Sequence, residues 1–160
     1  MVLFLSTFIN KIDRKGRVSV PAPFRSALAD QRFAGIVAFS SFRDSYNAIE
    51  ASGMDRMERL SASIDKLNPF SDEHDDFASV IFGTSVQISF DGEGRIVLPA
   101  HLRAHADITD QAAFVGRGAT FQIWQPAALE EFQTEARKRA RATRATLRLE
   151  PGEEGSHDRR

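Results

Sequence analysis

Two short segments of the 160-residue chain carry the side chains best suited to binding chemistry. Each places an aspartate three residues before a glycine and four residues before an arginine: Asp13, Gly16 and Arg17, then Asp91, Gly94 and Arg95. Such spacing predicts a tight turn, because the carboxylate accepts backbone N–H groups while the glycine supplies a positive φ angle. An arginine on this turn can neutralise a phosphate or address guanine O6 and N7 through two hydrogen bonds. We therefore interpret the aspartates and glycines as turn-organising residues and the arginines as candidate ligands for a polyanion.

The two segments differ in charge. Residues 13–25 hold four cations against one acid, a net charge of +3, whereas residues 91–103 are neutral. The first segment is thus the better phosphate surface, and the candidate DNA-binding residues are Arg14, Lys15, Arg17 and Arg95. For Arg95 two interpretations stay open, a DNA contact or a partner for Asp91 that fixes the turn. The competing interpretation of both motifs is a solvated turn in which each arginine pairs with the aspartate four residues earlier.

These segments belong to a longer internal repeat. Residues 13–25 align without gaps to residues 91–103, at an offset of 78 residues and with six identities in 13 positions. In each copy an apolar strand follows the turn, and a proline ends that strand and opens a short helix. Arg25 and Arg103, one turn into these helices, are expected to form structural ion pairs or lie on the surface. Each copy therefore predicts a β-hairpin followed by one helix.

Further elements follow from the apolar pattern. Alternating or continuous apolar runs predict strands at residues 35–39, 113–115 and 121–124, with a weaker one at 46–49. Apolar residues at three- and four-residue spacing predict a helix that begins near Met54 and stops at Asn68-Pro69. Ser71 is a candidate cap for a second helix that ends near Gly83, and a third helix begins after Pro126. Because neither small β unit can bury its apolar face alone, the two copies are expected to pair about a pseudo-two-fold axis.

Composition narrows the classes of function. The net charge of −1 excludes a generally basic nucleic-acid coat, so that any polyanion site must be a local patch. Charge is nevertheless segregated, since residues 44–76 carry a net charge of −6 and residues 136–149 hold six cations and no acid. This separation suggests self-association, a polyanion partner, or both. No run is long and apolar enough to cross a membrane and the chain has no cysteine, so we expect a soluble, unexported protein.

No segment carries a strong catalytic or metal-binding signature. Residues 71–76 hold acids and a histidine, but consecutive residues do not share one helix face, which favours a solvated helix start. His101 and His105 lie four residues apart without a third ligand. Phosphate loops, nucleophile elbows and His-Glu-x-x-His motifs are missing from the sequence. We therefore predict no cofactor and no metal, and a hydrolase is the weakest of the alternatives.

The repeated segments resemble the MraZ family. The resemblance rests on residues 13–25 and 91–103, on Val115-Gly, and on Phe121-Gln-Ile-Trp124, and it runs from about Phe4 to about Phe132. It implies two SpoVT/AbrB-type motifs per chain, with the family's paired Asp-x-x-x-Arg motif at Asp13 to Arg17 and Asp91 to Arg95. It also implies a bacterial regulator of the division and cell-wall gene cluster that assembles into rings and binds short repeated promoter boxes upstream of its own gene.

The expected fold class is α+β. Two AbrB-like β-hairpin and short-helix repeats would pack as a pseudo-two-fold β-barrel, with amphipathic helices added. The corresponding divisions are a first repeat at 4–50, a helical connector at 51–83, a second repeat at 84–126, a C-terminal helix at 127–149 and a disordered tail at 150–160.

The predicted function is sequence-specific binding of double-stranded promoter DNA by a homo-oligomer, expected to be a ring, without catalysis. We expect neither a small-molecule substrate nor a membrane partner, and a cytoplasmic, nucleoid-associated location. The alternative is an AbrB-type antitoxin that binds a toxin protein and its own promoter. Such antitoxins usually carry one motif per chain, so the duplicated motif argues against this alternative.

Overall fold

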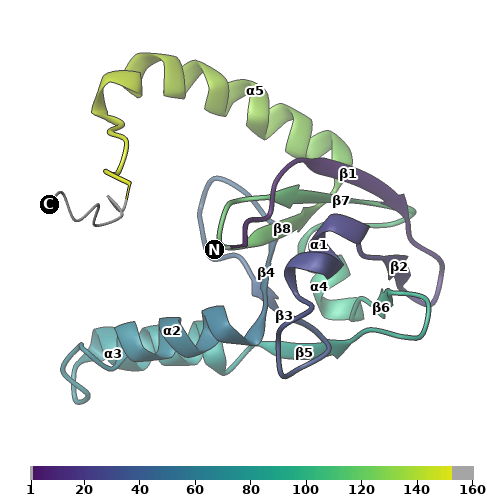
Figure 1. The fold of residues 1–160 in the computed structure, drawn as a ribbon, viewed down its shortest axis with the longest axis horizontal. Coiled ribbons are helices and arrows are strands. Elements are labelled where there is room, and N and C mark those ends of the chain that lie inside the picture. The colour runs from purple at the N-terminus through teal and green to yellow at the C-terminus, as the bar shows by residue number, and fades with distance from the viewer. Residues whose placement is uncertain (1, 153–160) are drawn as a thin grey trace, which may run out of the picture.

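The computed structural model describes residues 2–152 (Figure 1). Its strands are β1 (Thr7–Lys11), β2 (Arg17–Ser19), β3 (Gly35–Ser40), β4 (Ile49–Ser52), β5 (Val86–Ser89), β6 (Arg95–Val97), β7 (Gln111–Gly116) and β8 (Phe121–Trp124). Its α-helices are α1 (Ala22–Ala27), α2 (Met54–Ile64), α3 (Asp72–Phe77), α4 (Ala100–His105) and α5 (Pro126–Thr143). A π-helical segment (Ala78–Phe82) continues α3, and a 3-10 turn (Arg144–Thr146) continues α5. The α+β class predicted from the sequence is confirmed.

The sheet order shows how the two repeats combine. Six strands form an antiparallel sheet in the order β1-β7-β8-β4-β3-β5. When each strand is replaced by its counterpart in the other repeat, this order reads the same in reverse. The offset between the repeats falls from 78 to 76 residues after the short helices, because the loop that follows α1 is two residues longer than the loop that follows α4. With this offset the registers agree, since Phe8 pairs with Phe114 just as their counterparts Val86 and Ala38 pair. A pseudo-two-fold axis therefore runs through the centre of the sheet, as the repeat predicted.

A second, two-stranded sheet, β2 with β6, lies on the same axis. We call it the ribbon. Its central pair is Val18 with Ile96, which are counterparts in the repeat and are each 1% exposed. Two backbone hydrogen bonds flank it symmetrically, from Leu98 N–H to the Gly16 carbonyl (2.8 Å) and from Val20 N–H to the Gly94 carbonyl (3.2 Å). The ribbon is therefore made of one strand from each repeat.

The expectation that each repeat folds as its own hairpin is wrong. β1 forms its ladder with β7, and β2 forms its ladder with β6, so that both partners come from the other repeat. Within the first repeat, the two strands are joined by the turn, by a bridge between Ile12 and Val18, and by the Asn10 side-chain amide, which donates to the Ser19 carbonyl at 2.7 Å. This pairing across the repeats gives each three-residue strand, β2 and β6, a symmetric partner, and the central side chains of both strands, Val18 and Ile96, face the core. The barrel is not confirmed, because the six-stranded sheet ends at β1 and β5.

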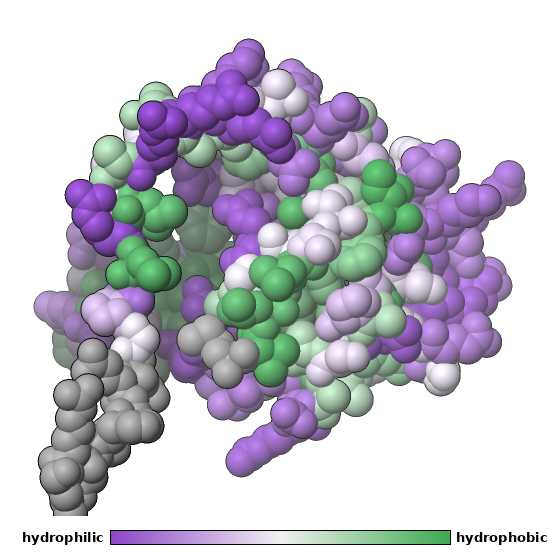
Figure 2. Space-filling model, turned by 45° about the horizontal axis from the view of Figure 1, so that its top comes forward, coloured by the Kyte–Doolittle hydropathy of each residue, from purple (hydrophilic) through white to green (hydrophobic). Residues whose placement is uncertain are grey.

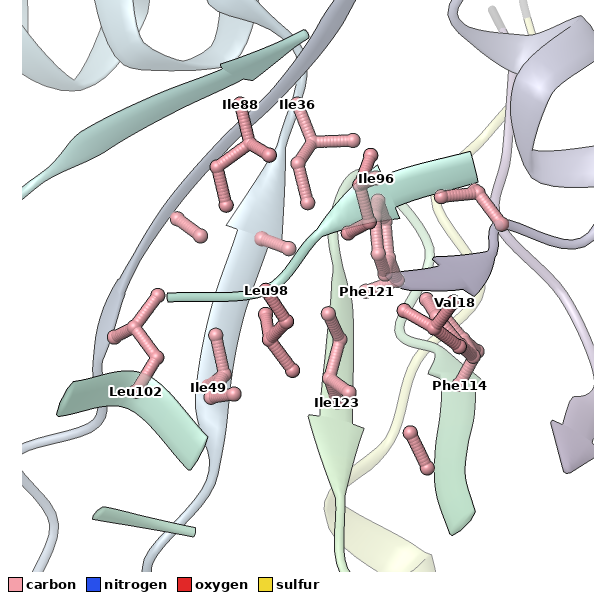
Figure 3. Packing of buried hydrophobic residues seen from close by; sticks show 14 of the residues in the cluster. Val18, Ile36, Ile49, Ile88, Ile96, Leu98, Leu102, Phe114, Phe121 and Ile123 are labelled. Atoms are coloured by element: carbon pink, nitrogen blue, oxygen red, sulfur yellow. The ribbon is translucent and has the colours of Figure 1, made fainter. Parts of the chain in front are cut away.

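The main core lies between the inner face of the six-stranded sheet and the layer formed by the ribbon, α1 and α4. Figure 3 shows these side chains converging from both repeats. Phe24 of α1 and Leu102 of α4 are fully buried at equivalent positions, and Phe24 packs against Phe4 and Phe121 at ring-centroid distances of 5.3 and 5.0 Å. Burial of apolar surface at about 25 cal/mol per Å² is the main force that holds this layer on the sheet.

The outer face of the sheet is covered by helices from outside the repeats. α5 packs Leu129 against Trp124 and Val115, while α2 and the π-helical segment pack on Val37. On the axis between them, Gln122 is buried and its amide donates to the Glu50 carboxylate at 2.7 Å. Burial raises the pKa of Glu50, although its bond to Gln122 opposes this. Gln122 also accepts Nη1 of Arg117 at 2.8 Å and donates to the Tyr46 hydroxyl at 3.1 Å, so the helices leave a small polar cluster at the centre of an apolar face.

The structure confirms some of the helix boundaries predicted from the sequence and corrects others. Ser71 caps α3 as predicted, since its hydroxyl oxygen accepts the His74 N–H at 3.2 Å. The C-terminal helix is shorter than expected, because α5 ends at Thr143 and only a 3-10 turn follows before extended backbone at Leu147. The expected disordered tail falls largely at 153–160, outside the described residues. Within residues 2–152, no helix combines the length and apolar character needed to span a bilayer.

The turn glycines generate a first prediction. Gly16 has φ +88°, and a Cβ there would lie 2.7 Å from the Leu98 carbonyl oxygen, which belongs to the other repeat. We expect Gly16→Ala to lower the free energy of unfolding by about 1–3 kcal/mol, because of the left-handed backbone and this contact. Gly92→Ala is the matched control, since a Cβ at Gly92 would meet no atom within 4 Å. Urea unfolding at fixed protein concentration measures both, and equal midpoints for the two variants would contradict the account.

Candidate nucleic-acid interface

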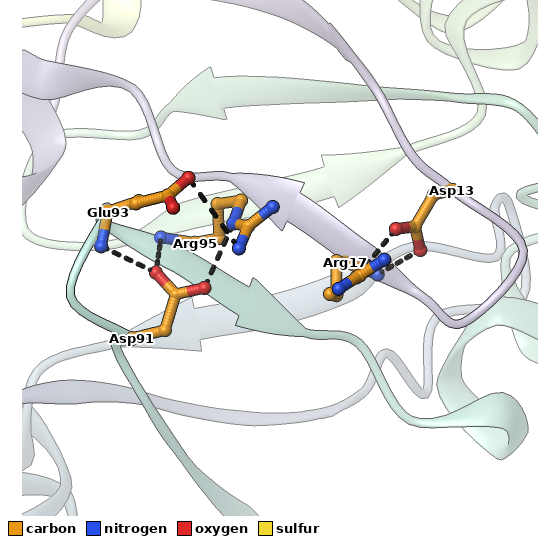
Figure 4. A network of polar contacts seen from close by, with 5 residues as sticks. All are labelled: Asp13, Arg17, Asp91, Glu93 and Arg95. Carbon is orange, nitrogen blue, oxygen red and sulfur yellow. Dashed lines mark hydrogen bonds and ion pairs between the residues drawn. The ribbon is translucent and has the colours of Figure 1, made fainter.

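The first turn is organised by Asp13. Its Oδ1 atom accepts the backbone N–H of Lys15 at 3.0 Å. Figure 4 shows the two contacts with Arg17, whose backbone N–H donates to Oδ1 at 2.9 Å and whose Nε donates to Oδ2 at 2.7 Å. The Gly16 N–H closes the turn on the Asp13 carbonyl at 3.0 Å. One carboxylate therefore sets the backbone of the turn and the direction of the arginine side chain.

The second turn repeats this geometry. Asp91 accepts the N–H groups of Glu93 (2.8 Å) and Arg95 (2.9 Å) through Oδ1, and Nε of Arg95 at 2.9 Å through Oδ2. Gly94 has φ +74°, close to its counterpart Gly16. The pairing of each arginine with the aspartate four residues earlier, which was the competing interpretation of both motifs, is thus present in both turns. It engages Nε of Arg17 and leaves the Nη groups available, and 41% of the side-chain surface is exposed.

These contacts also set the charge of both turns. Hydrogen bonding from the Arg17 backbone N–H, helped by the guanidinium, lowers the pKa of Asp13 below its ordinary value. The Arg95 backbone N–H does the same for the pKa of Asp91, and the Asp91 carboxylate in turn raises the pKa of Arg95. Both turns therefore hold a fixed ion pair throughout the neutral pH range.

The ribbon places both turns on one surface. Residues alternate along a strand, so Val18 and Ile96 point to the core while the residues on either side of each point outward. The outward residues are Arg17 and Ser19 of β2, and Arg95 and Val97 of β6. Arg17 lies opposite Val97, and Ser19 lies opposite Arg95. The two arginines, 78 residues apart in sequence, therefore belong to a single face.

Arg25 and Arg103 have a role that their sequence pattern did not reveal. Nε of Arg25 donates to the Val20 carbonyl at 3.1 Å, and Nε of Arg103 donates to the Leu98 carbonyl at 3.0 Å. Each guanidinium also lies across the turn of the other repeat, because a Cβ on Gly94 would come within 2.8 Å of the Arg25 side chain. The sequence did offer one indication of this role, because an arginine recurs twelve residues after the turn aspartate in both repeats. These arginines join the repeats. Among residues 2–152 neither forms an ion pair, which was one of the two expectations, whereas the exposed position of Arg25 agrees with the other.

The two ends of the face differ in charge. Arg14 and Lys15 are exposed, and no carboxylate of residues 2–152 lies within ion-pair distance of either. In the second turn, Glu93 occupies the position of Lys15 and lies 3.6 Å from Nη2 of Arg95. The face is thus cationic at the first turn and neutralised at the second, in agreement with the charge difference between the two segments.

The other candidate residues lie elsewhere. The basic part of α5 extends away from the ribbon, and α2 and α3 project from another side of the sheet (Figure 1). His105 Nε2 lies 3.3 Å from the Ser41 hydroxyl, and His101 is exposed. In the part of the chain that the structure describes, no three histidine or carboxylate side chains gather as a group able to hold a metal ion.

The fold and this face together define a class of protein. It is a single-chain pseudo-dimer, in which two copies of one arginine-bearing turn share a β-ribbon. Comparison with known proteins then identifies the family. Residues 81–149 match the family described as "MraZ protein, putative antitoxin-like".

Curated relatives match nearly the whole chain. A protein named transcriptional regulator MraZ from Rickettsia bellii (strain OSU 85-389) is 51% identical over 149 residues, which cover 92% of this chain and 98% of the relative. The protein of the same name from Pelagibacter ubique (strain HTCC1062) is 51% identical over 148 residues, covering 92% and 94%. The one from Rickettsia rickettsii (strain Sheila Smith) is 48% identical over 148 residues, covering 92% and 98%. The chain belongs to the MraZ family, as its repeated segments predicted.

The turn aspartates generate a prediction about pH. A carboxyl group whose pKa is lower in the folded chain stabilises the fold above its unfolded-state pKa of about 4, and this contribution is lost as the pH falls through the folded-state value. Asp91 is such a group. We expect Asp91→Asn to melt at a lower temperature than the unsubstituted protein at about pH 7, and the difference to shrink between about pH 4 and pH 2.

Thermal unfolding at fixed protein concentration and low salt measures this difference. Asp44→Asn, at an exposed acid outside both turns, is the control for the loss of one negative charge. The account would be contradicted if the difference in melting temperature between Asp91→Asn and the unsubstituted protein stayed constant across the acidic range. The stabilisation would then not depend on the ionised carboxylate of Asp91.

Proposed function

We propose that this protein is a transcriptional regulator that binds double-stranded promoter DNA in a sequence-specific manner through the ribbon and its two turns. The observation that carries this proposal is the shared face, on which the turn aspartates hold two arginines in place and two exposed cations, Arg14 and Lys15, lie beside the first of them. Preorganised cations suit a polyanion, because little side-chain freedom is lost when the contact forms.

The shape of the face supports duplex DNA. The major groove, about 12 Å wide, admits a two-stranded β-ribbon, and the base edges there carry a distinct pattern for each base pair. Arg14 and Lys15 lie beside the ribbon and can neutralise phosphates, which position a protein without reading the sequence. Arg17 is directed by Asp13 but keeps its Nη groups available, as a bidentate contact with guanine requires.

The biological assignment rests on the family. The three relatives described above are named transcriptional regulators. The resemblance implies a target among the division and cell-wall genes, with repeated boxes upstream of the protein's own gene. We propose the same target for this chain, together with a cytoplasmic, nucleoid-associated location.

We further propose that the protein acts as a homo-oligomer, in the form of a ring. Its opposite charges are carried by separate projecting elements, since α3 is acidic and exposed while α5 has an exposed basic end. Figure 2 shows a strongly hydrophilic surface along α5. Head-to-tail contacts between unlike surfaces close into rings when the rotation allows it. An oligomer would bind several boxes at once, so that avidity compensates for the small patch on each protomer.

An antitoxin function is the second candidate, because the matched family description includes the words "antitoxin-like". Binding of a toxin requires a protein-binding surface, which the exposed apolar side chains of the chain could form. A comparison of binding to one box and to several boxes separates the two candidates, since a protein whose main task is toxin binding would not depend on tandem boxes for its affinity.

The proposal is tested with DNA from upstream of the protein's own gene. We expect tight binding to a fragment with several boxes, and Arg17→Lys should weaken it by about tenfold to a hundredfold per engaged box. Lysine keeps the charge but loses the planar fork, so binding to unrelated DNA and its salt dependence should change little. Arg141→Lys, on the exposed end of α5, is the matched control. Equal affinities of the unsubstituted protein for upstream and unrelated DNA would refute the function, and an unaffected Arg17→Lys would refute the assigned residue.

A further inference from the structure

One apolar side chain interrupts the polar face of the ribbon. Val97 is 54% exposed, although the residues on either side of it, Ile96 and Leu98, are buried in the core. The other outward residues of the ribbon are Arg17, Ser19 and Arg95. A β-branched residue fits a strand, but the core does not require an apolar side chain at an outward position.

The place of Val97 on the ribbon is specific. It lies directly opposite Arg17, and side chains at opposed positions of an antiparallel pair have Cβ atoms about 4.5–5.5 Å apart. This spacing exceeds the rise between successive base pairs, about 3.4 Å, by less than one further base-pair step. A ribbon that brings Arg17 to a base edge therefore brings Val97 to the same base pair or to its neighbour.

The pseudo-two-fold axis shows that this feature breaks the symmetry of the face. The counterpart of Val97 is Ser19, which lies opposite Arg95. The ribbon thus presents an arginine with two methyl groups on one side of the axis, and an arginine with a hydroxyl group on the other. A symmetric ribbon would bind a DNA site equally well in either orientation, whereas this asymmetric ribbon can distinguish the two orientations.

We propose that Val97 is a specificity-determining residue that contacts the methyl group of a thymine beside the base addressed by Arg17. The C5-methyl group of thymine is the one apolar group that an unmodified base pair presents in the major groove, and apolar side chains recognise it. The proposal rests on the DNA-binding function proposed above. Ser19 makes no such contact at the dyad-related position, so each protomer binds its box in one orientation.

An exposed valine can also belong to a contact between protomers. The surroundings of Val97 argue against this, because the core of a protein–protein interface is depleted in acidic side chains. Arg17 and Arg95 occupy the same narrow face, and each stands beside its own carboxylate. A contact between protomers is therefore the alternative outcome of the test below.

The experiment is a cycle that combines a protein substitution with a DNA substitution. The box is first located by footprinting on the upstream fragment, and each of its thymines is then replaced in turn by deoxyuridine, which lacks only the methyl group. We expect one such replacement to weaken binding of the unsubstituted protein about three- to fivefold, the effect of one methyl group leaving an apolar contact. Val97→Ala should weaken binding to the original box and should respond little to that same replacement.

Leu5→Ala is the matched control, because Leu5 is exposed and apolar but lies outside the ribbon. It should behave like the unsubstituted protein at every thymine. Equal losses in the unsubstituted protein and in Val97→Ala at every position would overturn the proposal. So would a Val97→Ala protein that sediments as a smaller species while its thymine pattern stays intact, since Val97 would then belong to a protomer contact. Absence of any preference for the upstream fragment would instead refute the DNA-binding function itself.

Discussion

The structure depends on the exchange of strands between its two repeats. Each turn is completed by the other copy, because the Gly16 carbonyl accepts the Leu98 N–H and the Gly94 carbonyl accepts the Val20 N–H. Arg25 and Arg103 reinforce this exchange by lying across the opposite turn while each binds a carbonyl of its own return strand. Neither repeat can therefore complete its strand pairing and its share of the core independently. Folding of the binding face and formation of the pseudo-dimer are one event.

This constraint explains the character of the binding face. A turn on an isolated three-residue strand would be mobile, but the ribbon is fixed from beneath by Val18 and Ile96 and from the sides by the two turn aspartates. The arginines are thereby held before any partner arrives, and the entropic cost of binding is reduced. Duplication also allows the two halves to diverge without loss of the fold. The cations at Arg14 and Lys15, and the methyl groups of Val97, give the symmetric scaffold a charged end and a direction.

Much of this arrangement could be predicted from the sequence, because it depends on local chemistry. The spacing of Asp, Gly and Arg predicts both turns, and the apolar pattern predicts the position of α2. The partners of the strands could not be predicted in the same way. A three-residue strand such as β2 carries no information about whether it pairs within its own repeat or across the axis, since the same alternation suits both. The role of Arg25 followed from that pairing and was missed for the same reason. The predicted end of the C-terminal helix lies beyond the observed end, because the exposed residues after Thr143 have helical propensity but no other element to pack against.

The central claim is that one ribbon, shared by the two repeats, is the surface that meets DNA. The absence of cysteine allows a direct test, because a single cysteine at Ser19 can carry an iron chelate that cleaves nearby DNA with hydroxyl radicals. The same label at Ala140, on the exposed end of α5, provides the comparison. The account predicts cleavage from Ser19→Cys centred in each box of the upstream fragment, and weak or displaced cleavage from Ala140→Cys. Cleavage within the boxes from Ala140→Cys alone would contradict it, since the DNA would then lie along α5 and not on the ribbon.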